Sequence, residues 1–122
     1  KNGLYLSQFN DGDPAVISHF AYFHDCMRVN EQRDDGHGMR GGKYAIKNKD
    51  LLELNEEQLN ILYKACAGHT GGRNPSNDTI ACCWEADRLD LRRVGIEPDI
   101  QWFYSDAAKE MVTNKDFTPI DN

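Results

Sequence analysis

The sequence predicts an all-α protein, a compact bundle of helices in a single domain. Apolar residues recur at helical spacing in several segments, as in Val16, Phe20 and Phe23. Residues that start and end helices flank these segments, and no alternation of apolar and polar residues is long enough to predict a strand. The 122 residues suit one domain. We expect residues 1–112 to form it and residues 113–122 to be a frayed C-terminal tail.

Local signals predict the first helices. Lys1–Phe9 reads as the back half of a helix, because its apolar residues fall at helical spacing. Asp13 is a good N-cap, and Pro14 suits the first helical position. The helix that begins there is expected to end between Met27 and Val29, where polar residues take over.

Signals of the same kind divide the rest of the chain. Asn55 is an N-cap with Glu56 and Glu57 in the first turn, where negative charge is favourable. Gly95 and Pro98 interrupt a later segment. The predicted helices are one from Gly36 that includes Ile46, one from Asn55 to Gly68, one from Asp78 to Leu91 and one from Asp99 to Val112.

Composition and charge argue against two classes of partner. The net charge is −6, whereas nucleic-acid binding proteins carry a basic patch or stripe. No run approaches the roughly 20 apolar residues that a membrane span needs. No secretory signal is visible at the start, and the four cysteines contain no CxxC pair. We therefore expect a cytoplasmic protein with reduced thiols that binds neither nucleic acid nor membrane.

Ionisable side chains interrupt the apolar stripes of three predicted helices. His24, His69 and Asp87 stand where an apolar residue is expected, and Asp25 lies beside His24. His37 begins a helix, where a charged imidazole gains nothing from the helix dipole. Burying such groups is unfavourable unless they are paired. A metal ion would pair with all of them, so the sequence predicts a metal site made of these five residues.

Ordinary structural roles compete with this interpretation. His24 could hydrogen-bond a backbone carbonyl, and Asp87 could form a buried ion pair with a cation such as Arg28. His69 could stabilise the C-terminus of its helix as a cation. His19, on the other edge of its helix from Asp25, is expected at the surface.

The order of these residues resembles a known family. The segments that carry the resemblance are Phe20-Ala21-Tyr22-Phe23-His24-Asp25, Cys66-Ala67-Gly68-His69-Thr70 and Trp84-Glu85-Ala86-Asp87-Arg88-Leu89-Asp90, with His37 at a helix start between the first two. Over about residues 1–100 the chain resembles the HD-domain superfamily of metal-dependent phosphohydrolases. Within it, the chain is most similar to small bacterial HD-domain-like proteins.

The resemblance implies a metal held by an early His, a His-Asp doublet and a late Asp. His24, Asp25 and Asp87 match the last three, whereas residues 1–9 contain no histidine that matches the first. His37 and His69 match the additional histidines of relatives that bind two metal ions. Those relatives often carry a further His at the position of Gly68.

The resemblance also implies a function, the hydrolysis of a nucleotide or another small phosphate ester with a divalent metal. Imidazole and carboxylate ligands suit Mn, Fe, Ni, Co or Zn. Asp25 is expected to ligate the metal or orient the nucleophile, and Arg28 to bind the substrate phosphate through its planar fork. Arg40, Lys43 and Arg73 are further candidates for the phosphate because they lie near the candidate ligands in the sequence.

Two other functions stay open. The chain could be a non-catalytic, degenerate HD-like module that binds a metal, a ligand or a partner without turning it over. A metal-dependent oxygenase with two iron ions is the third possibility, since some HD-like relatives use that chemistry.

Overall fold

The computed structural model describes residues 2–28 and 36–121 of the chain. Within these residues every regular element is a helix, which confirms the predicted all-α class. The elements are, in chain order, α1 (Asn2–Leu6), the 3-10 helix η1 (Ser7–Phe9), α2 (Pro14–Phe23), α3 (His37–Lys47), α4 (Lys49–Leu52), α5 (Glu56–Gly68), α6 (Asp78–Asp90), η2 (Leu91–Val94), η3 (Ile100–Trp102), α7 (Asp106–Asn114) and α8 (Thr118–Asp121).

Side-chain caps begin several helices where the sequence predicts them. The carboxylate of Asp13 accepts a hydrogen bond from the backbone N–H of Ala15 at 3.0 Å. Asn55 and Gln58 form a reciprocal capping box at the start of α5, with bonds of 2.8 and 2.9 Å. Asn77 caps α6 by accepting a hydrogen bond from the backbone N–H of Ile80 at 2.9 Å. These helices therefore begin at positions that local chemistry determines.

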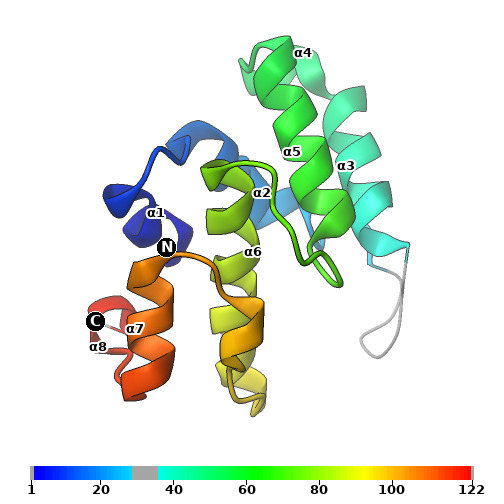
Figure 1. Cartoon of the computed structure of the whole chain (residues 1–122). Coiled ribbons are helices and arrows are strands. Elements are labelled where there is room, and N and C mark those ends of the chain that lie inside the picture. Colours follow the sequence, from blue (N-terminus) through cyan, green and yellow to red (C-terminus); the bar gives the residue numbers. More distant parts are fainter. Residues whose placement is uncertain (1, 29–35, 122) are drawn as a thin grey trace.

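Helix α6 lies near the middle of the bundle, with α1, α7 and α8 on one side and α3, α4 and α5 on the other (Figure 1). α1, α2 and α5 pack against α6, and α7 lies between α6 and α8 in this view. α3 and α5 form an antiparallel pair that α4 joins at one end (Figure 1). The buried core that unites these helices includes Leu6, Val16, Phe20, Leu62, Ile80, Cys83, Leu89, Phe103, Met111 and Ile120.

Glycines let α3 approach its neighbours closely. A Cβ on Gly38 would collide with the backbone carbonyl of Cys66 on α5, and a Cβ on Gly41 would collide with the carbonyl of Phe23 at the end of α2. Any larger residue would push α3 outward. This close approach brings the first residue of α3 next to the end of α5, where two of the candidate histidines lie.

Helix α2 ends earlier than predicted, at Phe23. Residues 24–27 form a turn, closed by a hydrogen bond of 3.2 Å from the N–H of Arg28 to the carbonyl of Asp25. At this point α3 packs on the last carbonyl of α2, since Gly41 lies against the carbonyl of Phe23. The predicted end at Met27 is therefore wrong, and Val29 lies outside the described residues.

The helix predicted over residues 99–112 is two helices. η3 ends before Phe103, whose backbone is extended (φ −121°, ψ 145°), and α7 begins after the N-cap Ser105. The buried carboxylate of Glu85 on α6 accepts hydrogen bonds from the N–H groups of Tyr104 (2.7 Å) and Ser105 (2.9 Å). These bonds hold the extended connection and replace the helical bonds that an uninterrupted helix would make.

The C-terminal segment packs on the domain and does not fray. Residues 118–121 form α8, and Ile120 is 3% exposed within the core. Asp121 accepts two hydrogen bonds from the guanidinium of Arg92, at 2.7 and 3.0 Å. The sequence prediction places residues 113–122 in a tail, whereas residues 118–121 contribute to the core.

The four thiols are free, and Cys66, Cys82 and Cys83 are buried while Cys26 is half-buried. Burial raises the pKa of Cys66 to about 12, which makes its thiol unreactive near neutral pH. None of the described helices has the length and apolar character that crossing a membrane requires.

Candidate metal centre

Five predicted ligands come from four separate segments of the chain. His24 and Asp25 directly follow α2, His37 is the first residue of α3, His69 directly follows α5, and Asp87 lies on α6. In the sequence they are spread over more than sixty positions. The packing of α2, α3, α5 and α6 brings them into one cluster.

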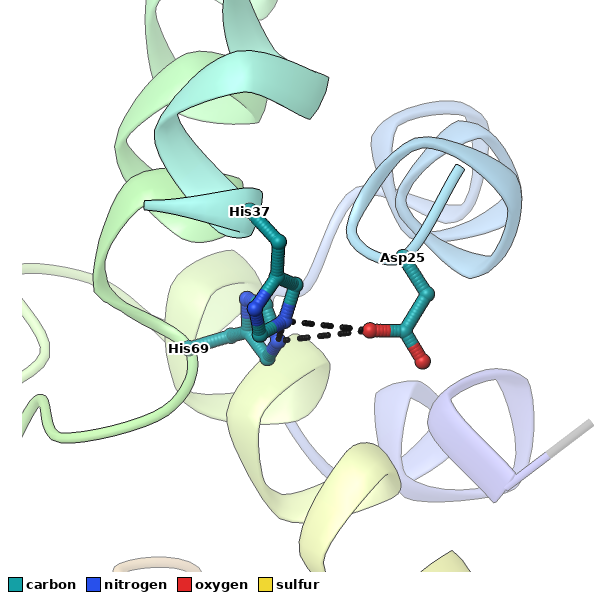
Figure 2. Close-up of side chains that lie close together, drawn as sticks. All are labelled: Asp25, His37 and His69. Atoms are coloured by element: carbon teal, nitrogen blue, oxygen red, sulfur yellow. Dashed lines mark hydrogen bonds and ion pairs between the residues drawn. The ribbon is translucent and has the colours of Figure 1, made fainter. Parts of the chain in front are cut away.

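Asp25 lies against two histidines (Figure 2). One of its carboxylate oxygens is 3.1 Å from Nε2 of His37 and 3.8 Å from Nε2 of His69. The two Nε2 atoms lie 2.9 Å from each other. Two lone pairs at this separation repel, so the two nitrogens must share either a proton or a cation. The three side chains are close enough for one ion to contact all of them.

The other two predicted ligands adjoin this group. Nε2 of His24 is 3.1 Å from a carboxylate oxygen of Asp87 and 3.5 Å from the second oxygen of Asp25. The carboxylate of Asp25 therefore faces both halves of the cluster, with one oxygen toward His37 and His69 and the other toward His24. A carboxylate in this position could contact two ions or one.

Backbone carbonyls orient two of the imidazoles. Nδ1 of His24 donates to the carbonyl of Phe20 at 2.8 Å, and Nδ1 of His69 donates to the carbonyl of Cys66 at 2.7 Å. In the neutral tautomer, each of these rings then directs the lone pair of Nε2 into the cluster. Histidines that ligate metals generally make such a second hydrogen bond, so these rings fit a metal ion.

Burial and pairing shift the pKa values of three groups in the cluster in different directions. Burial lowers the pKa of His24, but the hydrogen bond and charge of Asp87 outweigh it, so the pKa lies above the ordinary 6.5. Burial raises the pKa of Asp87, but the bond from His24 brings it below 3.8. Burial lowers the pKa of His69. The shifts therefore favour a charged His24 paired with the carboxylate of Asp87, and a neutral His69.

Arg28 lies at the edge of the cluster. One guanidinium nitrogen is 3.2 Å from Nε2 of His37 and 3.8 Å from an oxygen of Asp25. The side chain is 29% exposed, so its charge faces both the cluster and solvent. The guanidinium therefore borders the ligand atoms without being enclosed by them.

The other predicted phosphate contacts are placed differently. The guanidinium of Arg40 donates to the backbone carbonyl of Met27 at 3.2 and 3.3 Å, so it supports the turn that carries Asp25. Arg73 lies over the ring of Trp102, 4.3 Å from its centre. Lys43 is exposed on α3. Of the four cations proposed from the sequence, Arg28 contacts side chains of the cluster.

Sequence reasoning missed two features of the site. The ring of Phe20 stacks on His24 with centroids 4.6 Å apart and fixes the imidazole plane. A cavity of about 420 Å³ borders His24 and Asp87, and Asp90 and Asp121 also line it. The spacing of Asp90, one helical turn after Asp87, could have indicated the first of these carboxylates. No local signal places Asp121 there, since it arrives through the packing of α8.

The chain was compared with models of known protein families, with curated proteins and with solved structures, and none of the three comparisons gives a match.

Proposed function

We propose that this protein is a divalent-metal-dependent phosphohydrolase of the HD-domain type that acts on a small phosphate ester. The observation that supports the proposal is the convergence of three imidazoles and two carboxylates with two rings anchored through Nδ1. Such a mixed set of nitrogen and oxygen donors suits Mn, Fe, Ni, Co or Zn.

The chain's own residues have distinct parts in this proposal. His24, Asp25, His37, His69 and Asp87 would hold the metal. Bound in this cluster, a divalent ion supplies a water of lowered pKa and offsets negative charge on the phosphoryl oxygens. Asp25 orients the attacking water, because its two oxygens face both halves of the cluster. Arg28 binds the phosphoryl group at the edge of the site.

The proposed reaction is hydrolysis of a phosphomonoester. The oxygen of water forms a new bond to phosphorus, and the bond from phosphorus to the ester oxygen breaks. The electron pair of that bond goes to the leaving oxygen, which takes up a proton. The products are inorganic phosphate and an alcohol.

The first test is the metal content of the purified protein after it has been loaded with Mn, Fe, Ni, Co or Zn in separate experiments. We expect near-stoichiometric retention of at least one of these metals, and a large loss in His37→Ala. The same samples are then assayed for phosphate release from p-nitrophenyl phosphate.

Arg28→Ala should keep its metal and lower kcat/KM by about tenfold to a hundredfold, since a charge-assisted hydrogen bond contributes about 1.5–3 kcal/mol. Retention of no metal would contradict the proposal.

The ion pair between His24 and Asp87 favours one alternative. Because these groups already neutralise each other in the absence of an ion, the cluster could instead be a structural network in a non-catalytic HD-like module. In that case the protein would retain no metal, and chelators would leave its melting temperature unchanged. A protein that retains metal and loses stability with chelator would argue against this alternative.

A further inference from the structure

The cavity beside the cluster has walls of two kinds. Its apolar walls include Ile17 and Phe20 of α2 and Ile120 of α8. Its polar groups include Asp90 at the end of α6, Arg92 in η2 and Asp121 in α8. Its volume of about 420 Å³ lies in the range of sites that enclose small molecules, roughly 300–1,000 Å³. A sugar or a nucleoside fits a space of this size.

The cavity is continuous with the candidate metal centre. His24 and Asp87 belong both to the cluster and to the cavity wall. Asp90 lies three residues after Asp87 on α6, on the same face and about one helical turn, roughly 5 Å, farther along. A molecule whose phosphate lay at the cluster would therefore direct its remaining atoms along α6 toward Asp90 and Asp121.

The far end of the cavity is poor in available positive charge. Two carboxylates, those of Asp90 and Asp121, line it together with one guanidinium, that of Arg92. Arg92 donates to both oxygens of Asp121, at 3.0 and 2.7 Å, and lies over the ring of Phe117 at 4.0 Å. Its fork is thus directed at a carboxylate of the protein. Asp90 accepts from the guanidinium of Arg93 at 2.9 Å, but Arg93 is 71% exposed and does not line the cavity. A second anionic group of a ligand would therefore meet the carboxylate of Asp90 from the cavity side.

Carboxylate oxygens favour a different chemistry in the ligand. They accept hydrogen bonds, so they bind hydroxyl and amino groups well and phosphate poorly. The apolar side chains of Ile17 and Ile120 would contact the carbon atoms of the same molecule. Arg28 lies on the cluster and is not among the residues that line the cavity, so its guanidinium serves the phosphate end of the ligand.

We propose that this cavity receives the alcohol part of the phosphomonoester and selects a leaving group that carries hydroxyl or amino groups and no second anionic group. This inference rests on the proposed hydrolysis at the cluster. It assigns the substrate class as phosphorylated polyols, sugars, nucleosides or amino alcohols, and it excludes bisphosphates. Asp90 and Asp121 are the residues that determine this specificity.

Fructose 6-phosphate and fructose 1,6-bisphosphate are a matched pair of probes, because they differ by one phosphate at the far end of the sugar. The metal-loaded protein is assayed for phosphate release from each. In parallel, amide chemical shifts of the ¹⁵N-labelled protein are followed during titration with each sugar. We expect kcat/KM to be at least about tenfold higher for the monophosphate, since like charges a few ångströms apart near a protein surface repel at this scale. We also expect larger shifts with the monophosphate at Ala21 and Ala86, which line the cavity.

Charge-neutral variants test the assigned residues. Asp121→Asn removes one carboxylate and releases the fork of Arg92. Asp90→Asn removes the other carboxylate together with its exposed pair to Arg93, and it keeps the pair between Arg92 and Asp121. Each should reduce the preference for the monophosphate by about threefold to tenfold. Glu110→Gln, a matched loss of one exposed charge on α7 outside the cavity, should leave the preference unchanged.

The two readouts separate failure of this inference from failure of the proposed function. Equal hydrolysis of both sugars, or hydrolysis without shifts at Ala21 and Ala86, would overturn the role assigned to the cavity. The proposed phosphohydrolase function would stand. Shifts with the monophosphate and not with the bisphosphate, in the absence of phosphate release, would overturn the proposed hydrolase function. They would support the preference of the cavity for a ligand with one phosphate. Neither hydrolysis nor shifts with either sugar would overturn both.

Discussion

Replacing Asp87 by Asn tests the cluster most directly, because the substitution keeps the shape of the side chain and removes its charge. The Asp87 carboxylate is 20% exposed and lies 3.1 Å from Nε2 of His24, which is 14% exposed. A hydrogen bond to a charged group at a site this buried contributes about 1.5–3 kcal/mol. We therefore expect the free energy of unfolding of the metal-free protein to fall by about that amount at pH 6.

The pH dependence of this loss follows from the two pKa shifts. The pKa of His24 is raised, so its contribution to stability is present at low pH and is lost as the pH rises through the raised pKa. The pKa of Asp87 is lowered, so its contribution is present above the ordinary value of 3.8 and is lost as the pH falls through the lowered pKa. The stability difference between the wild type and Asp87→Asn should therefore be largest between about pH 4 and 6.5, near the two ordinary pKa values.

Urea denaturation of the metal-free proteins from pH 3 to 9, with metal analysis of the loaded proteins, measures both consequences. Asp87→Asn should also lose most of its bound metal, because an amide is a weaker ligand than a carboxylate. His19→Ala is the control, since His19 contacts Phe23 and no cluster residue in the described contacts. A variant with undiminished metal content would refute the role of Asp87 as a ligand. A stability difference that is constant across the pH range would refute the ion pair with His24.

Two further substitutions test how the fold positions the cluster. Gly38→Ala should lower both the melting temperature and the metal content, because its Cβ would collide with the carbonyl of Cys66; Gly71→Ala, with no atom within 4 Å of the new Cβ, should change neither. Ile120→Ala should destabilise the protein by about 2–5 kcal/mol in urea denaturation, as expected for a buried aliphatic side chain. Leu51→Ala, which is 79% exposed, is its control, and an Ile120→Ala effect no larger than that of the control would show that α8 does not belong to the core.

Local chemistry predicts much of this fold. The start of α5 follows from the capping box of Asn55, and the start of α6 from the cap of Asn77, because each is decided by residues within one turn. The break before α7 is different. It depends on the carboxylate of Glu85, which lies about twenty positions earlier and reaches the backbone of Tyr104 only after α6 has packed. Contacts of this kind leave no local periodicity.

The candidate site shows the same division. An ionisable residue in an apolar stripe is visible in the sequence, so His24, His69 and Asp87 could be predicted as members of one cluster. The pairing within the cluster could not be predicted from the sequence. Nε2 of His37 lies 2.9 Å from Nε2 of His69, and this distance depends on how closely α3 approaches α5. That approach depends on Gly38, whose role becomes visible only when its neighbours are known.

The early end of α2 bears directly on how the cluster works. On a continuous helix, His24 and Asp25 would point about 100° apart, and Asp25 would diverge from His24. In the turn, Asp25 instead lies 3.5 Å from Nε2 of His24 through one oxygen and 3.1 Å from Nε2 of His37 through the other. In this turn the same carboxylate lies within reach of both halves of the cluster. A substitution that extends α2 through the turn would therefore change the distances from Asp25 to His24 and His37 even with every proposed ligand still present.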